Sequence, residues 1–213
     1  MGRFTIDLHW TFHLWVWLII FILYYFLTLR KREGWLDHRV IINAFFIFYL
    51  LFVFRFVFIP FSMWPNEADR VYFITEIMQG KLPTWWEIAN INFVPLRSLM
   101  RTLSAPLVIW RFTFVFVSGN FILLFPLSIF VGLLSRKGLT FKKALLIGFL
   151  TTLFIESTQL LINLTTRWSN RLVCVDDLLL NTLGALLGYF VFKKYHRFFE
   201  KIISLFYQFL TWS

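Results

Sequence analysis

The sequence contains only one cysteine and few charged residues, and both shortages restrict what the protein can be. A single cysteine, Cys174, cannot form an intramolecular disulfide. Charged residues make up 15% of the 213 residues, whereas typical soluble domains contain about 25%. The four histidines show no metal-ligand spacing, and none lies near the polar residues described below. We therefore predict no metal site and no cofactor.

Apolar residues take up most of the chain instead. Hydrophobic residues account for 59% of the sequence, with 29 Phe and 10 Trp, and the mean hydropathy is +0.72. Soluble domains rarely exceed about half apolar residues, so the composition predicts an integral membrane protein. The formal net charge of +10 is typical of basic residues gathered in short cytoplasmic loops, and we expect no nucleic-acid partner.

Five apolar segments are long enough to cross a bilayer as helices. We predict an all-α, polytopic transmembrane helical bundle that forms a single integral membrane domain over residues 1–213. In the last segment, the spacing of Gly184 and Gly188 predicts close packing against a neighbouring helix. The predicted spans are Leu8–Leu29, Val40–Phe61, Thr113–Leu134, Lys143–Leu164 and Val175–Phe192.

Basic residues predict the orientation of this bundle. They occupy the first and third loops and follow the last span: Arg30, Lys31, Arg32, Arg39, Arg136, Lys137, Lys142, Lys143, Lys193, Lys194, Arg197 and Lys201. With five spans these clusters fall on one side, which is cytoplasmic by the positive-inside rule. The N-terminus is then outside and the C-terminus cytoplasmic. We expect the short apolar segment Phe198–Trp212 to lie along the inner membrane surface.

The second loop, Ser62–Phe112, is predicted to hold short interfacial helices on the outer surface. Repeated prolines prevent one continuous helix. Asn66 is expected to cap a helix that continues to Gln79. Arg97 and Arg101 stand one helical turn apart among apolar residues, which is typical of a helix lying in the membrane interface.

Polar side chains lie within or beside the predicted spans, where ionisable groups are costly and are taken as functional by default. Glu156, Gln159 and Asn163 share one helical face, and Asp177 and Asn181 share another. A rise of about 1.5 Å per residue puts the polar groups of four spans at a similar depth below the outer surface. We therefore predict one outward-facing polar site formed by Arg55, Asn120, Glu156, Gln159, Arg171, Asp176, Asp177 and Asn181.

Structural explanations for these residues stay open at this point. Arg55 can extend to the outer headgroups, and Asn120 can simply connect neighbouring helices by hydrogen bonds. The two aspartates that open the last span can cap its helix. Glu156 can form a buried ion pair with Arg55 or Arg171, since a carboxylate at this depth needs a partner or a proton. Arg167 and Arg171 both lie in the short outer loop before the last span, close enough to meet Asp176, Asp177 or Glu156.

The order and spacing of these residues follow a known pattern. Glu156-Ser-Thr-Gln159 precedes Arg171, and Val175–Tyr189 continues with Asp-Asp and then Asn-Thr-Leu-Gly-Ala-Leu-Leu-Gly. Two earlier segments fit as well, Asn92-Phe-Val-Pro-Leu96 and Asn120–Leu127 with its proline. Over about residues 92–189, the chain resembles the VanZ-like family of bacterial membrane proteins.

The resemblance implies a small multi-span protein of the bacterial cell membrane. The namesake of the family is associated with resistance to the lipoglycopeptide teicoplanin, and no catalytic mechanism comes with the name. Relatives often carry a further acidic residue where this chain has Cys174. We interpret Asp176 and Asp177 as sufficient without it.

Two classes of function fit the predicted site. In the first, a cell-envelope protein binds an amphiphile of the outer leaflet, such as a membrane lipid, a lipid-linked cell-wall precursor or a lipoglycopeptide antibiotic. In the alternative, a membrane-embedded enzyme acts on a lipid-linked substrate, with Glu156 and Asp177 as acid and base. A transporter is less favoured, because no internal repeat is visible and the inner halves of the last two spans are nearly all apolar.

Overall fold

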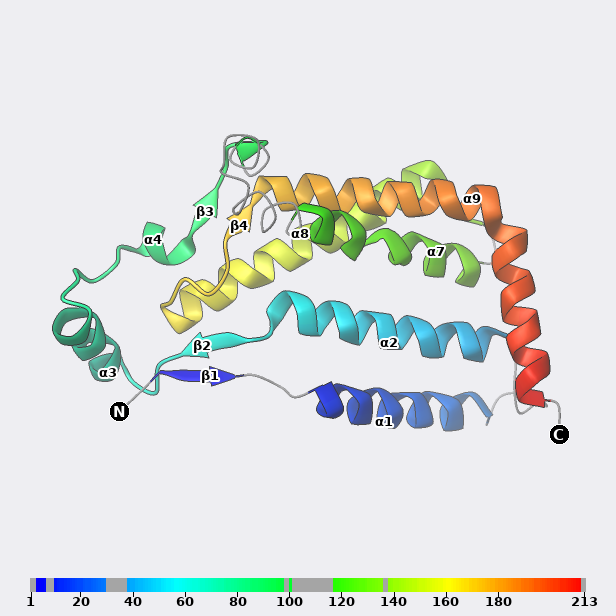
Figure 1. Cartoon of the computed structure of the whole chain (residues 1–213), viewed down its shortest axis with the longest axis horizontal. Helices are drawn as coiled ribbons and strands as arrows, with labels where there is room; N and C mark the ends of the chain where they lie inside the picture. Colours follow the sequence, from blue (N-terminus) through cyan, green and yellow to red (C-terminus); the bar gives the residue numbers. More distant parts are fainter. Residues whose placement is uncertain are drawn as a thin grey trace, which may run out of the picture.

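Long helices lying side by side form the body of the protein (Figure 1). The computed structural model describes residues 3–6, 10–29, 38–97, 100, 117–135 and 138–211. The predicted all-α bundle is confirmed within these residues. Its long helices are α1 (Trp10–Leu29), α2 (His38–Phe58), α7 (Phe125–Leu134), α8 (Phe141–Thr166) and α9 (Val175–Thr211).

Four described helices are long and apolar enough to cross a membrane: Arg39–Phe58, Val117–Leu134, Phe141–Thr166 and Val175–Leu205. Helix α1 coincides with most of the first predicted span and packs against α2, where the Trp17 indole donates a hydrogen bond of 2.9 Å to the Ala44 carbonyl. Leu8 and residues 113–116, which belong to predicted spans, lie outside the described residues.

Helix α2 ends at Phe58, three residues before the predicted boundary at Phe61. Pro60 explains the difference, because its ring disfavours a helical conformation for the preceding residue and it has no N–H to donate. The chain continues into strand β2 (Phe61–Met63), which pairs antiparallel with β1 (Phe4–Ile6).

The third apolar segment is broken near its middle. Residues 117–123 are helical, Leu124 departs from helical geometry, and α7 then begins with Pro126 in its first turn. The break leaves the Leu123 carbonyl available, and the buried Tyr49 hydroxyl of α2 donates a hydrogen bond of 2.8 Å to it. A proline break in a membrane helix is tolerated when a neighbouring side chain satisfies the freed carbonyl.

Helix α8 begins after Thr140, whose hydroxyl accepts a hydrogen bond from the Lys143 backbone amide. One face of α8 is buried along most of its length, and its polar members Thr152, Glu156, Gln159 and Asn163 all lie on that face. The other faces carry exposed leucine and phenylalanine side chains, as expected of a helix surrounded partly by lipid.

Helix α9 is longer than the predicted fifth span and contains a break in helical geometry at Tyr195. Its last part turns across the end of the bundle (Figure 1). Arg39, Lys142 and Lys194 belong to this end, where α2 and α8 begin, and we call it the basic end. Its assignment to the cytoplasm stays a prediction, and residues 30–32, 136 and 137 lie outside the described part of the chain.

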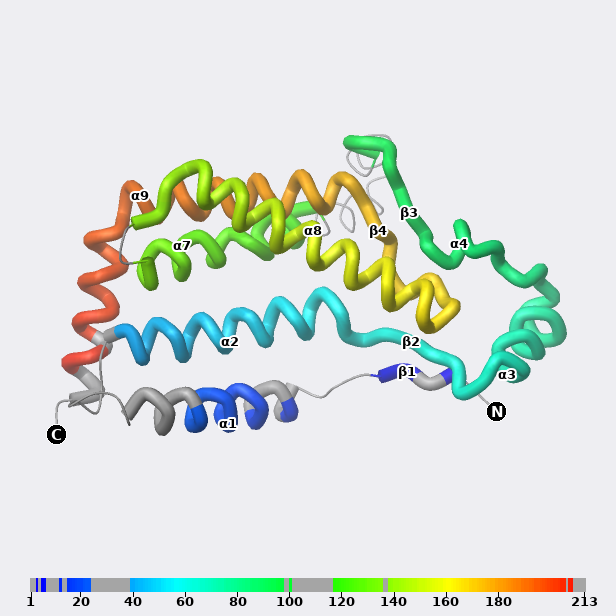
Figure 2. The backbone as a smooth tube through the Cα atoms, turned by 180° about the vertical axis from the view of Figure 1, so that it is seen from behind, coloured from blue at the N-terminus to red at the C-terminus, as the bar shows by residue number. Residues whose placement is uncertain are grey.

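The chain between α2 and residue 97, here called the long loop, extends beyond the opposite end of the bundle (Figure 2). Asn66 caps a helix as predicted, but the helix becomes a π-helix after Tyr72 and ends at Ile77. Arg101 lies outside the described residues. The elements of this loop are α3 (Glu67–Tyr72), η1 (Phe73–Ile77), α4 (Trp85–Ala89) and β3 (Ile91–Asn92), and β3 pairs in parallel with β4 (Val173–Cys174).

Two glycines allow α9 to lie directly against the backbone of the broken third segment. A Cβ atom added at Gly184 would lie 1.8 Å from the Phe121 carbonyl oxygen, and one at Gly188 would lie 2.0 Å from the Phe125 carbonyl oxygen. The predicted close packing at this glycine pair is therefore present, and it brings α9 against the third apolar segment.

The Gly184→Ala substitution is expected to destabilise the bundle by roughly 1–3 kcal/mol, because the new methyl group meets backbone that cannot move alone. Thermal stability in detergent, followed by size-exclusion chromatography after heating, would measure the loss. Gly119→Ala is the matched control, since its Cβ would meet nothing within 4 Å. Equal melting of the two variants would contradict the close approach.

Candidate functional site

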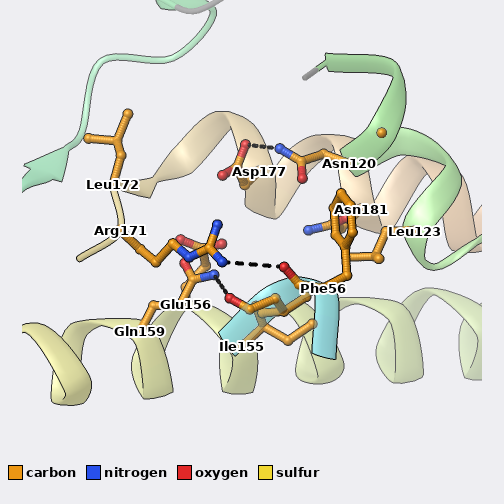
Figure 3. A pocket seen from close by; sticks show the side chains of 12 residues that line it. Phe56, Asn120, Leu123, Ile155, Glu156, Gln159, Arg171, Leu172, Asp177 and Asn181 are labelled. Atoms are coloured by element: carbon orange, nitrogen blue, oxygen red, sulfur yellow. Dashed lines mark hydrogen bonds between the residues drawn. The ribbon is translucent and has the colours of Figure 1, made fainter. Parts of the chain in front are cut away.

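A cavity of about 290 Å³ lies among α2, α8, the start of α9, the helical segment 117–123 and the loop between α8 and α9. Figure 3 shows Asp177 and Asn120 on one side of it, Glu156 and Gln159 on the other, and the Arg171 side chain between them. Six of the eight predicted site residues line this cavity: Asn120, Glu156, Gln159, Arg171, Asp177 and Asn181.

The two carboxyl groups of the cavity are buried, and each has a single hydrogen-bond donor among the described residues. The Cys174 backbone amide donates to Glu156 Oε2 over 3.0 Å, and Asn120 Nδ2 donates to Asp177 Oδ1 over 2.6 Å. Neither carboxyl group forms an ion pair within the described part of the chain. The predicted alternative of a buried Glu156 ion pair with Arg55 or Arg171 is therefore not present in this structure.

Arg171 uses part of its guanidinium group to hold the end of α2. Its Nη2 donates to the carbonyl oxygens of Ile59, at 3.2 Å, and Phe56, at 3.5 Å. Its Nε is buried and has no hydrogen-bond partner. Burial lowers the pKa of the guanidinium below its ordinary value, although an arginine keeps its charge at physiological pH. The cavity therefore contains a positive charge whose buried Nε donor is unused.

Asn163 determines where Arg171 lies, because its side chain binds both backbone groups of that residue. Its Nδ2 donates to the Arg171 carbonyl over 2.7 Å, and its Oδ1 accepts from the Arg171 amide over 3.1 Å. The same side chain binds the Ala89 carbonyl and the Asn170 amide, and Asn90 donates a second hydrogen bond to the Arg171 carbonyl. Asn163 is 0% exposed and thus connects α8, the long loop and the loop before α9.

Two amide side chains complete the polar wall. Gln159 Nε2 donates to the Val57 carbonyl over 3.3 Å, and Asn181 Nδ2 donates to Thr152 Oγ1 over 3.2 Å. Asn181 is 1% exposed, and its Oδ1 has no hydrogen-bond partner. The polar wall therefore contains groups whose hydrogen-bonding capacity the protein itself does not use.

Two predicted site residues lie elsewhere. Arg55 belongs to α2 next to Phe56 but does not line the cavity. Asp176 is buried, and its Oδ1 accepts a hydrogen bond from the Leu96 amide at 2.5 Å, so it connects the long loop to the start of α9. The helical periodicity explains this separation, because adjacent residues such as Asp176 and Asp177 project about 100° apart.

Arg167, which was expected near the carboxylates, pairs with Glu67 of α3 at 2.9 Å instead. Arg70, itself buried, also binds Glu67 and donates to the Arg167 carbonyl. The hydrogen bonds from Arg70, followed by those from Arg167, hold the pKa of the Glu67 carboxyl below its ordinary value. This cluster positions α3 against the end of α8, away from the cavity.

The apolar part of the cavity wall was not predicted. It consists of Phe56, Val57, Gly119, Leu123, Ile155 and Leu172. Phe56 is 52% exposed and Leu172 is 37% exposed, so the cavity opens at the protein surface beside apolar side chains. Leu172 lies in the loop before α9, and the other five belong to helices that also carry polar residues. The sequence gives no further signal for this wall, because apolar residues occur throughout these helices.

The arrangement permits binding and proton transfer. The carboxyl groups and amide oxygens can accept hydrogen bonds, and Arg171 can donate to an anion. Ser157 is exposed and does not line the cavity, and Cys174 lies behind the wall, where Asn92 Nδ2 donates to its sulfur at 3.4 Å. Within the described residues, the lining therefore contains no serine, cysteine or histidine that would act as a nucleophile.

Comparison with known proteins supports the resemblance seen in the sequence. The family model described as VanZ/LLP1 matches residues 46–200, which include α2 from its middle onward and most of α9. No curated protein and no solved structure matches the chain.

The Asn163→Ala variant is expected to release the loop before α9. It leaves backbone donors and acceptors of Ala89, Asn170 and Arg171 without this partner, at about 1–3 kcal/mol for each group that stays buried. We expect faster tryptic cleavage after Arg167 and Arg171 in purified protein, detected by mass spectrometry. In the control Thr165→Ala, which removes only hydroxyl bonds to carbonyls of the same helix, cleavage should stay at the wild-type rate.

Proposed function

The chain belongs to the VanZ/LLP1 family, and on that premise we propose that it is a bacterial cell-envelope protein that binds the headgroup of an outer-leaflet amphiphile. The cavity formed by residues of α2, α8, α9 and their connections is the proposed binding site. Binding positions the ligand at the end of the bundle opposite the basic end, which the positive-inside rule assigns to the exterior.

The observation that carries this proposal is a polar cavity with an apolar rim inside a membrane bundle. A volume of about 290 Å³ lies at the small end of the range for ligand sites, which suits a headgroup better than a whole lipid. The exposed Phe56 and Leu172 at the rim suit acyl chains that stay in the bilayer. Polar groups kept at this depth without ion pairing are costly unless they serve a ligand.

Candidate ligands are a membrane lipid, a lipid-linked cell-wall precursor or a lipoglycopeptide antibiotic. All three combine a polar headgroup with a hydrocarbon tail, as the cavity and its rim require. The family resemblance implies an association with teicoplanin resistance. This association would follow if the protein retains the antibiotic itself, or the lipid that carries the antibiotic's target.

Expression in a teicoplanin-susceptible host should raise the inhibitory concentration of teicoplanin, and Glu156→Ala, Asp177→Ala and Arg171→Ala should each return it to the empty-vector value. Each substitution removes a polar group of the cavity wall. Membrane abundance, measured by immunoblot, must stay normal. Glu76→Gln, at an exposed position of η1, is the control and should keep the resistance. Full resistance in all three cavity variants would refute the proposal.

A second candidate function is catalysis on a lipid-linked substrate, and the presence of two buried carboxyl groups on one cavity favours it. Glu156 and Asp177 each have one hydrogen-bond donor and no ion pair within the described residues, so one can hold a proton while the other accepts one. The two carboxyl groups have different environments, because a backbone amide donates to Glu156 and the Asn120 side chain donates to Asp177.

Purified protein would then convert a lipid-phosphate or peptidyl-lipid substrate, and Glu156→Gln should reduce turnover at least about 100-fold, the usual contribution of general acid–base catalysis. Thin-layer chromatography of a labelled substrate would measure it. Binding of the same lipid by the variant should persist. If the wild-type protein retains the lipid but does not convert it, the catalytic function is refuted and only the binding function remains.

A further inference from the structure

Unused hydrogen-bond acceptors dominate the polar wall of the cavity. Each polar side chain that lines it, apart from Arg171, keeps one oxygen that accepts no hydrogen bond from the described residues. These atoms are Asn120 Oδ1, Glu156 Oε1, Gln159 Oε1, Asp177 Oδ2 and Asn181 Oδ1. The cavity is therefore complementary to a group that is rich in N–H donors.

Asn181 shows that this capacity is not an accident of surface exposure. Its side chain is 1% exposed, and its Oδ1 is buried without a partner, whereas its Nδ2 is held by Thr152. Buried acceptors are rarely left unsatisfied, because each costs about 1–3 kcal/mol of desolvation. An unsatisfied acceptor on a cavity wall points to a donor that the ligand brings.

Arg171 adds the opposite property at the same cavity. Its buried Nε has no partner, and its Nη2 already donates to the end of α2. A guanidinium group with a free donor binds phosphate or carboxylate oxygens by charge-assisted hydrogen bonds. The wall is thus chemically complementary to an anion at Arg171 and to a cationic donor at the carboxyl groups.

We propose that the headgroup held in this cavity combines a primary ammonium, bound by Glu156, Asp177 and Asn181, with a phosphate bound by Arg171. This inference rests on the proposed function and names the chemical class of its ligand. A primary ammonium has three N–H donors for these acceptors, whereas a quaternary ammonium has none. A headgroup that carries only a phosphate would leave the second oxygen of each buried carboxyl group without a donor.

Native mass spectrometry of the purified full-length protein tests the inference directly. The protein is offered equal amounts of phosphatidylethanolamine, phosphatidylcholine and phosphatidylglycerol with identical acyl chains. We expect phosphatidylethanolamine to be retained at least about tenfold more than either competitor, the factor expected for losing one hydrogen bond to a charged group. Soluble phosphoethanolamine is offered separately, at the same concentration, to test whether the acyl chains are needed.

The outcomes separate this inference from the function on which it rests. Equal retention of phosphatidylcholine or phosphatidylglycerol would overturn the headgroup class and leave amphiphile binding intact. No retention of any lipid would overturn both. Retention of soluble phosphoethanolamine at the level of phosphatidylethanolamine would support the headgroup class and count against a membrane amphiphile as its source.

Two isosteric variants test which atoms make the selection. Glu156→Gln and Asp177→Asn each keep an oxygen to accept the existing hydrogen bond from Cys174 or Asn120, but place an amide NH₂ where the unused carboxylate oxygen lay. We expect the preference for phosphatidylethanolamine over phosphatidylcholine to fall about tenfold in each. Glu76→Gln, on η1, should keep the wild-type preference, and unchanged selectivity in both cavity variants would overturn the assignment.

Discussion

The structure depends on one constraint, which is that polar groups buried in an apolar bundle need hydrogen-bond partners, since the hydrocarbon around the bundle supplies none. The loop between α8 and α9 supplies them. The Arg171 backbone forms hydrogen bonds with the Asn163 side chain, and the Cys174 amide donates to the Glu156 carboxylate. The polar face of α8 therefore holds this loop in place. Arg171 projects into the cavity as a consequence, and β4 pairs with β3 from the long loop.

Close helix packing provides the second half of the site. Gly184 and Gly188 bring the α9 backbone against the carbonyls of the broken third segment. Asp177 and Asn181 precede Gly184 on the same helix and are thereby brought to the cavity, where Asn120 donates a hydrogen bond to Asp177. The break at Leu124 separates the helical segment that carries Asn120 from α7, and the Tyr49 hydroxyl donates a hydrogen bond to the Leu123 carbonyl at this break.

Helix positions and the gathering of polar residues were largely predictable, whereas individual side-chain partners were not. Hydrophobic runs located the helices, but the prediction carried α2 past Pro60, whose backbone restrictions end it at Phe58. Depth estimates placed Arg55 with the other polar residues, yet depth does not specify direction around a helix axis. Arg167 was expected beside the carboxylates and pairs with Glu67, because α3 lies within its range after the long loop folds back.

The sequence alone determined the membrane character, the α-helical class, the family resemblance and the residue types available to a polar site, because composition and periodicity are properties of the chain itself. Only the tertiary structure decided which polar side chains line the cavity and which are hydrogen-bonded to the backbone segments around it. Asp177 lines the cavity and the adjacent Asp176 binds a loop amide, a division that one helical step produces once neighbouring elements are in place. Hydrogen bonds to groups on distant segments determine which aspartate takes which role, and the local spacing of residues does not specify those partners.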